Sequence, residues 1–243
     1  MRNWAGKRYW LVGASDGVGA AFAERLSKAG AHVIVSARSE DKLEALVAGL
    51  PSEASFQTVD VSCDTSVTAA AQTIGPVDGV VYLAGVYWPF AAQDWDAAQA
   101  TAMADINFTG LVRVMGAVVP DMVTRDAGHI VITGSLSGFR GLPGSIGYTA
   151  AKAGTMSLAE CMYADMRGSG VQVQVANPGF IKTQLTDKND FKMPFIMSPQ
   201  EAAEEMFDHM NTRRFKVSFP RAFSWVFRGS QFLPDWLYFR IFS

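Results

Sequence analysis

The stretch "RYWLVGASDGVG", residues 8–19, joins a short apolar run to a glycine-rich loop. The apolar run is typical of a strand that is buried on both faces of a parallel sheet. Gly13, Gly17 and Gly19 allow a tight turn and a close approach to a phosphate, and a helix that begins here presents free N–H groups. The spacing is G-x-x-x-G-x-G. A simple turn is the alternative, but the place between a first strand and a first helix favours a nucleotide-binding loop.

The alternation of strand-like and helical runs continues along the whole chain. The strand-like runs are 8–13, 31–38, 55–61, 78–85, 128–135, 171–179 and 214–219. The helical runs are 18–29, 39–49, 64–73, 97–124, 148–168 and 199–211. The last helix has a start signal, with Ser198 as N-cap, Pro199 at the first helical position and Glu201 at the third. This order predicts a single-domain α/β fold of the Rossmann type, a doubly wound parallel sheet of about seven strands with helices on both faces.

Composition narrows the class of protein. The chain has 243 residues, 49% of them apolar and 18% charged, which excludes a disordered protein. A net charge of −2 gives no signal for nucleic-acid binding. Two cysteines, Cys63 and Cys161, and three scattered histidines indicate neither a disulfide scaffold nor a metal site. We see no signal peptide and no uncharged run of membrane-spanning length, so we expect a soluble cytoplasmic protein.

The end of the second strand bears on the choice of cofactor. Folds that prefer NAD usually place an acid here for the ribose 2′-hydroxyl, whereas this chain has Ser36, Ala37 and Arg38. An arginine can donate paired hydrogen bonds to a 2′-phosphate, so the sequence favours NADP(H) over NAD(H). The alternative is an exposed arginine at a helix entry, and Asp16 in the glycine loop counts mildly against NADP(H). Asp60, after the third strand, either accepts a hydrogen bond from adenine or caps the next helix.

A second group of polar residues lies in the second half of the chain. Tyr148 and Lys152 are four residues apart in a predicted helix and therefore share a face. Ser135 precedes Tyr148 by thirteen residues, and Leu136 rules out the G-x-S-x-G elbow of a hydrolase. Asn107 falls inside a helical run, where asparagine is a poor helix former. The alternatives to a functional role are a solvated Tyr–Lys pair on the surface and a surface turn or local kink at Asn107.

Together these motifs resemble the short-chain dehydrogenase/reductases. "GASDGVG", the pair Asp60–Val61, Asn107, Ser135, "YTAAK" at 148–152 and "NPGFIKT" occur in that family's order and spacing over about residues 7–220. The resemblance implies that Tyr148 is the acid/base, that Lys152 lowers its pKa and binds the nicotinamide ribose, that Ser135 orients the substrate oxygen, and that Asn107 holds a water of the proton path. It implies a cofactor site formed by Gly13, Ser15, Asp16, Gly17, Val18, Gly19, Arg38, Asp60, Val61, Ala84, Gly85, Tyr148, Lys152, Pro178, Gly179, Ile181 and Thr183.

Two positions depart from the family pattern. Val12 stands where the family usually has threonine, and Leu83 stands where it has the asparagine that braces the central sheet. Neither change removes a catalytic group.

The chemistry explains why phenol and amine must lie together. Lowering the pKa of a tyrosine from about 10 to about 7 requires roughly 4 kcal/mol. A lysine charge ~5 Å away supplies about 3 kcal/mol at an effective dielectric of ~20. Lys152 is therefore expected to supply most of this shift for Tyr148, and a positive oxidised nicotinamide to supply more.

Apolar residues in the loops after the strands predict the kind of substrate. They are Tyr87, Trp88, Phe90, Phe139, Phe180 and a predicted lid at 191–197. Core packing is the alternative for each, but together they favour an apolar carbonyl or alcohol. Arg140 in the same region either meets a carboxylate or is solvated.

The chain after residue 220 has a composition of its own. Residues 215–243 hold ten of the 28 aromatics, and residues 213–243 contain six Lys/Arg against the single acid Asp235. We expect residues 1–220 to form the oxidoreductase domain, with a cofactor half at about 1–130 and a catalytic half at about 131–220. The tail 221–243 either packs over the substrate cleft or a neighbouring subunit, contacts a membrane peripherally, or is disordered.

The sequence thus predicts an NADP(H)-dependent oxidoreductase of small or medium apolar carbonyls and alcohols. A non-catalytic NADP(H)-binding sensor on the same fold and a lyase-like or isomerising enzyme are the alternatives. The resemblance also implies a homodimer or homotetramer, with helices 97–124 and 148–168 as candidates for its interface.

Overall fold

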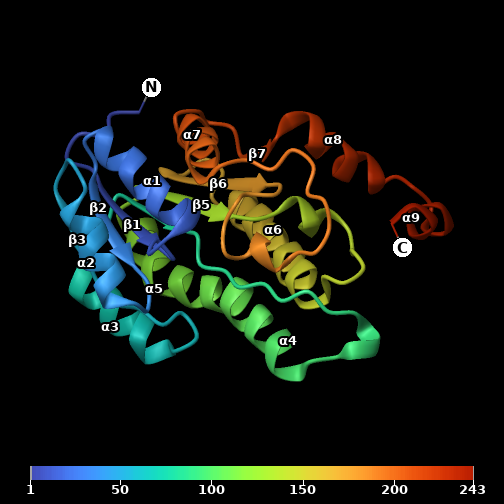
Figure 1. Cartoon of the computed structure of the whole chain (residues 1–243). Coiled ribbons are helices and arrows are strands. Elements are labelled where there is room, and N and C mark those ends of the chain that lie inside the picture. Colours follow the sequence, from blue (N-terminus) through green and yellow to red (C-terminus); the bar gives the residue numbers. More distant parts are fainter. Residues whose placement is uncertain (1, 243) are drawn as a thin grey trace.

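The structure is a computed structural model that describes residues 2–242. Seven parallel strands form one sheet in the order β3-β2-β1-β4-β5-β6-β7 (Figure 1). The strands are β1 (Arg8–Val12), β2 (His32–Ser36), β3 (Ala54–Phe56), β4 (Gly79–Tyr82), β5 (Gly128–Thr133), β6 (Val171–Pro178) and β7 (Lys216–Phe219). The order reverses between β1 and β4, which is where such sheets bind ligands. The predicted doubly wound α/β fold is confirmed.

Helices cover both faces of this sheet. The helices of the described residues are α1 (Gly17–Lys28), α2 (Glu40–Ala48), α3 (Asp64–Ile74), α4 (Ala97–Ala104), α5 (Gly110–Thr124), α6 (Ile146–Asp165), α7 (Pro199–Met210), α8 (Arg221–Ser230) and α9 (Asp235–Phe242). Helices α8 and α9 extend beyond the end of the sheet (Figure 1). The capping box predicted at the start of α7 is present, with Ser198 and Glu201 each accepting from the other's backbone N–H.

Side-chain alternation in the strands produces two apolar layers. In β1, Tyr9 and Leu11 pack with α1 and α7 on one face, whereas Trp10 and Val12 pack with α3 and α5 on the other. All four are almost completely buried. Because both faces are covered, the strands read as continuous apolar runs instead of alternating ones.

The predicted helix 97–124 is interrupted in the structure. Residues Asp105–Thr109 form a π-helical turn between α4 and α5. A turn of this kind adds one residue to the helix and often marks a functional position. By length and composition Ala97–Thr124 could also cross a membrane. Its second half instead packs Leu111, Val114 and Val118 into the core under the sheet.

The glycine loop is packed tightly against the loop after β4. Gly13 has a φ of +91°, and a Cβ at this position would lie 2.3 Å from the backbone nitrogen of Ala84. The backbone N–H of Gly13 also donates to Ser36 O at 2.7 Å, which ties the loop to β2. Only glycine meets both requirements, the positive φ and the close approach.

We predict that Gly13→Ala lowers the free energy of unfolding by at least about 3 kcal/mol, because strain in φ adds to a clash with backbone. Gly6→Ala is the matched control, since Gly6 has a φ of +69° but a Cβ added there would have no atom within 4 Å. It should lose only about 1–2 kcal/mol. Urea unfolding of both variants measures the difference, and equal losses would contradict the packing argument.

Candidate active site

A cleft of about 240 Å³ opens at the carboxyl ends of β4, β5 and β6. Ser135, Tyr148 and Lys152, three of the four predicted catalytic residues, line it. Predicted cofactor residues also line it, namely Val18, Gly85, Pro178, Gly179, Ile181 and Thr183. Residues from distant parts of the sequence therefore meet in one place, as the sequence predicted.

Helix α6 supplies the phenol and the amine. Its buried face contains Lys152, Thr155, Met156 and Ala159, spaced three or four residues apart. Tyr148 lies one turn before Lys152, and the Lys152 Nζ is 5.7 Å from the centre of the Tyr148 ring. Lys152 is 4% exposed, and its Nζ donates to Thr133 O at 2.8 Å. The pair is thus held inside the cleft and is not a solvated surface contact.

Ser135 lies just beyond the end of β5 and is buried. Its Oγ accepts hydrogen bonds from Ser137 N at 3.2 Å and from Ser137 Oγ at 2.9 Å. These two donors fix the orientation of the Ser135 oxygen. A hydroxyl fixed in this way can direct its own proton toward a substrate oxygen in the cleft.

Burial dominates the titration of the pair in the polypeptide. It raises the pKa of Tyr148 to about 12, although a hydrogen bond with Ser135 opposes the rise. It lowers the pKa of Lys152 to about 8. In the polypeptide alone, burial of the phenol therefore outweighs the lowering of the Tyr148 pKa that is expected from Lys152. The expectation from the sequence counted only the attraction between the two charges. It left out the cost of burying the phenolate, which is the larger effect here.

Asn107 lies in the π-helical turn and is fully buried, but it is not among the residues that line the cleft. Its side chain accepts from Val86 N at 2.8 Å and donates to Val86 O at 2.9 Å. Its backbone oxygen accepts from Thr155 Oγ1 at 3.1 Å. Asn107 thereby ties the loop after β4 to helix α6. The sheet end at Leu83, where the family's asparagine is missing, is bonded through its backbone N–H to Val12 O at 2.8 Å.

The glycine loop leads into the N-terminus of α1. Asp16 is the N-cap residue of α1, yet within the described residues its side chain makes no capping hydrogen bond, and the first turn contains no acid. The first N–H groups of α1 therefore lack the side-chain acceptor that helices commonly have there. A phosphate is a suitable partner for such groups.

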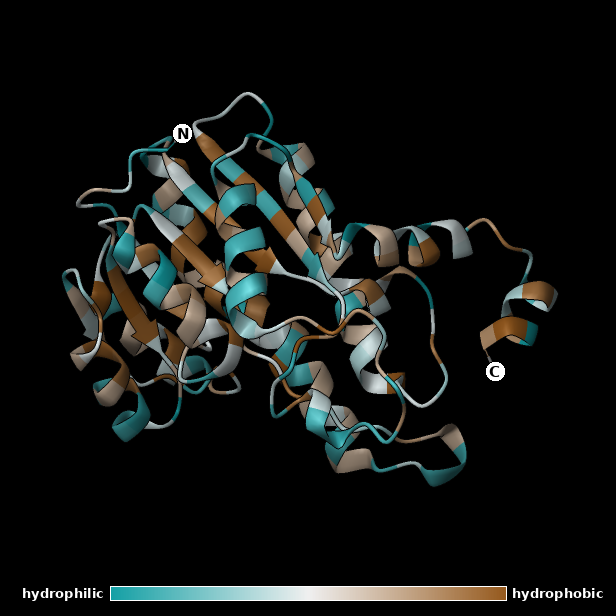
Figure 2. Cartoon of the chain, turned by 45° about the horizontal axis from the view of Figure 1, so that its top comes forward, coloured by the Kyte–Doolittle hydropathy of each residue, from teal (hydrophilic) through white to brown (hydrophobic). Residues whose placement is uncertain are grey.

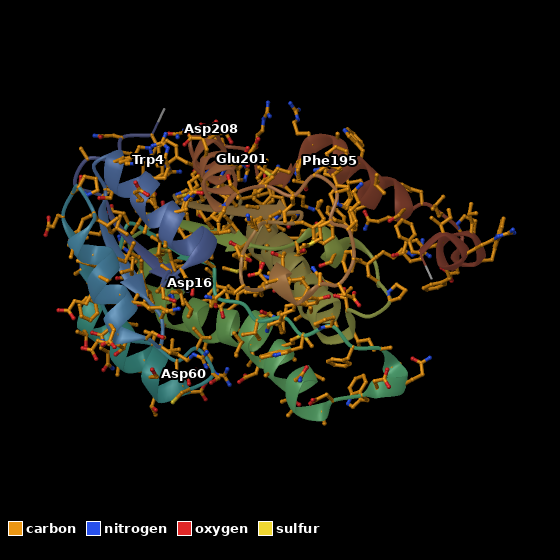
Figure 3. The ribbon with its side chains drawn as sticks, in the orientation of Figure 1. Trp4, Asp16, Asp60, Phe195, Glu201 and Asp208 are labelled. Carbon is orange, nitrogen blue, oxygen red and sulfur yellow. The ribbon has the colours of Figure 1, made fainter. Side chains whose placement is uncertain are left out.

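The predicted 2′-phosphate region contains one residue that the sequence analysis missed. Arg38 is exposed, and its charge helps to hold the pKa of Asp60 below the usual value, after two stronger hydrogen bonds from Ser62. Asp16, by contrast, forms an ion pair with Lys42 at 3.1 Å. Figure 3 places Asp16 at the start of α1. Lys42 thus offsets the negative charge of Asp16, and its position close to Arg38 in the sequence was the available signal.

One carboxylate oxygen of Asp60 accepts hydrogen bonds within the turn that follows it. Its Oδ1 accepts from Ser62 N at 3.0 Å and from Ser62 Oγ at 2.6 Å. The helix that follows has Cys63 as its N-cap residue, so Asp60 does not cap it. Figure 3 shows Asp60 beside α3. Its neighbour Val61 is buried in the core.

The residues present fit a nicotinamide dinucleotide. The first turn of α1, which has no side-chain cap among the described residues, follows directly from the carboxyl end of β1 and so lies at the same edge of the sheet. Thr133, which lines the cleft, has a buried Oγ1 with no partner among residues 2–242. A ligand with hydrogen-bonding groups suits this environment better than a purely apolar one.

The rest of the cleft is apolar. Of the predicted aromatics, Tyr87, Phe180 and Phe191 line it, whereas Trp88, Phe90 and Phe139 do not. Phe223 and Phe227, which helix α8 contributes from the tail, also line the cleft and were not predicted. The tail therefore packs over the cleft, one of the alternatives considered for it.

Arg140 anchors that tail and is not a solvated arginine. It forms an ion pair with Asp235 at 2.5 Å and donates to Ser230 O and Leu233 O at 2.7 Å each. Its guanidinium lies 3.9 Å from the centre of the Tyr238 ring. The loop after Ser135 is thereby joined to the segment between α8 and α9. The carboxylate that Arg140 meets belongs to this chain.

Comparison with known proteins shows the family of the chain. A family model described as short chain dehydrogenase matches residues 7–193. An oxidoreductase of Myxococcus xanthus is 35% identical over 236 residues, which cover 94% of this chain and 93% of that protein.

Solved structures share the fold. A short-chain dehydrogenase/reductase from Burkholderia phymatum in complex with NAD has a TM-score of 0.84 at 24% identity, covering 94% of each chain. An actinorhodin polyketide ketoreductase with NADPH has a TM-score of 0.80 at 24% identity, covering 90% of this chain and 97% of that one. On the family match and the Myxococcus relative, the chain belongs to the short-chain dehydrogenase/reductase family and is an NAD(P)-dependent oxidoreductase.

Proposed function

We propose that the protein transfers a hydride between NADP(H) and the carbonyl or alcohol group of an apolar substrate. The observation that carries this proposal is the meeting of Ser135, Tyr148 and Lys152 in one cleft. The same cleft is bounded by Val18 next to the glycine loop and by residues 178–183.

Each polar side chain has a part in this chemistry. The nicotinamide supplies or accepts the hydride. The Ser135 hydroxyl orients the substrate oxygen, and the Tyr148 phenol gives that oxygen a proton during reduction. Lys152 carries a positive charge below its pKa of about 8 and so favours the phenolate that remains. Asn107 positions the loop at Val86 and the helix that bears both groups.

The experiment that tests this proposal is a panel of carbonyls and alcohols assayed by NADPH absorbance. We expect turnover with apolar aldehydes or ketones, because Phe180, Phe223 and Phe227 line the cleft. An absence of turnover across the panel, together with tight NADPH binding, would favour a non-catalytic cofactor sensor.

For the cofactor, we predict that Arg38→Ala weakens NADPH binding by about 10- to 100-fold, because hydrogen bonds to charged groups contribute about 1.5–3 kcal/mol. Affinity for NADH should change little, since NADH lacks the 2′-phosphate. Fluorescence titration of both cofactors with both proteins measures this. A wild-type preference for NADH would overturn the assignment of NADP(H).

A further inference from the structure

Helix α8 has two apolar faces with different surroundings. Phe223 and Phe227 point into the cleft. Trp225 lies on the opposite side of the helix and Val226 on its flank, and they are 68% and 50% exposed. Burial of the first pair explains why α8 packs on the protein, but nothing in the described chain covers the second pair.

Neighbouring segments extend this exposed apolar surface. Figures 1 and 2 show α8 and α9 projecting beyond the end of the sheet, and Figure 3 places Phe195 beside α8. We define the tail surface as the exposed apolar residues of these segments, Phe195, Ile196, Trp225, Val226, Phe232, Trp236, Phe239 and Ile241. Soluble monomers rarely leave so many large apolar side chains exposed together, so this surface indicates a contact.

Phe195 adds backbone evidence. It has a φ of +55°, a conformation that costs a non-glycine residue about 1–2 kcal/mol. Its side chain is nevertheless 61% exposed. A strained backbone that presents a phenylalanine outward is more common at a binding surface than in an ordinary loop.

Cations outnumber acids in the tail itself, although Glu205 and Asp208 line the same hollow as Trp225 and Arg228. Lys192, Arg221 and Arg240 are exposed, and the Arg228 guanidinium lies 5.6 Å from the centre of the Trp225 ring. The one acid in residues 213–243, Asp235, is paired with Arg140. Aromatic side chains surrounded by cations are typical of segments that lie in the interface of an anionic lipid bilayer.

The tail surface is also continuous with the substrate cleft. The Phe195 and Phe223 rings are 5.6 Å apart, and Phe223 is 5.0 Å from Phe227 and 5.8 Å from Phe180. These rings make an unbroken apolar path from the exposed surface to the lining of the cleft. A second copy of the chain bound here would cover that path, whereas a bilayer would supply apolar molecules to it.

We propose that the tail surface docks on anionic lipid bilayers and that the cleft draws its substrate, an apolar carbonyl or alcohol dissolved in the bilayer, along this aromatic path. The identity of the substrate rests on the proposed function, but docking does not. Vesicle binding is therefore measured without cofactor or turnover, and its failure is distinguishable from a failure of the proposed oxidoreductase activity.

The first test is co-sedimentation of the full-length protein with vesicles of phosphatidylcholine alone or with about 30% phosphatidylserine. We expect binding to the mixed vesicles and at least about tenfold weaker binding to phosphatidylcholine alone, since each exposed cation contributes about a fivefold gain. The double variant Trp225→Ser/Trp236→Ser should lose most of the binding. Val123→Ser on α5, which removes an apolar side chain that is 51% exposed elsewhere, should bind as the wild type does.

The role of the cations is tested separately with two double variants that have the same net charge as each other. Arg221→Gln/Arg240→Gln should bind mixed vesicles about tenfold or more weakly. Lys7→Gln/Lys28→Gln removes the same charge from the other end of the molecule and should have no such effect. Absence of vesicle binding by the wild type would overturn the proposal. Vesicle binding that is retained by both the Trp225→Ser/Trp236→Ser variant and the Arg221→Gln/Arg240→Gln variant would also overturn it. If the tail variants instead convert an oligomer to monomers in sedimentation velocity and no protein binds vesicles, a second copy is the occupant and the proposal is wrong.

Discussion

Tyr148→Phe is expected to bind NADPH with wild-type affinity and to lose about 10²–10⁴-fold in turnover, the usual contribution of a general acid. The substitution removes one oxygen from a residue that lines the cleft and leaves the ring that packs edge-on against Tyr87 at 5.2 Å. Folding and cofactor contacts should therefore persist while the proton source is lost. Stopped-flow measurement of NADPH oxidation separates the chemical step from binding.

Tyr163→Phe is the matched control, because Tyr163 lies on the same helix but is exposed and stacks on Phe215. It should keep full turnover. Unchanged turnover in Tyr148→Phe would remove Tyr148 from the proposed mechanism, whatever the cofactor affinity.

Lys152→Met is expected to have opposite effects on activity and stability. Turnover should fall by about 100-fold or more, because no charge then favours the phenolate. Stability at neutral pH should not fall in proportion, since the buried ammonium has a pKa of about 8 instead of its ordinary 10.5 and thus disfavours the folded state while charged. On the proposed mechanism, Lys152 is maintained for its function against its cost to stability.

The pH dependence of stability tests this directly. Between about pH 8 and 10.5 the unfolded chain binds the Lys152 proton and the folded chain does not, so the stability of the wild type rises with pH in this window. Relative to Lys152→Met, the wild type should gain about 1.4 kcal/mol from pH 7 to pH 9. Tyr148, with a pKa of about 12, stays protonated in both proteins over this range. Urea unfolding at each pH measures the difference, and parallel curves for the two proteins would contradict the buried, shifted amine.

Local patterns in the sequence predicted most of the fold and the core of the site. Apolar runs indicated the strands because both faces of the sheet are covered, and Ser198 with Glu201 indicated the start of α7. The spacing of Tyr148 and Lys152 predicted that both share one helix face, because one helical turn separates them, and the neighbouring motifs predicted that this face meets the cleft.

Features that depend on distant contacts were not predictable in this way. The π-helical turn at Asp105–Thr109 adds one residue without changing the apolar pattern. Arg140 anchors residues about 95 positions later in the chain, so its partners left no local signal. The high pKa of Tyr148 follows from burial by the assembled cleft, which the spacing of two residues along a helix does not reveal.

The contribution of α8 to the cleft has a consequence for how the enzyme is made and how it diverges. During synthesis the ribosome completes the glycine loop, Ser135, Tyr148 and Lys152 before it reaches Phe223 and Phe227. Domains fold from the N-terminal side as they emerge, so the groups proposed for proton transfer can assemble before the aromatic wall proposed to select the substrate. Changes in that late segment can then alter which molecules are accepted while the inherited chemistry stays the same.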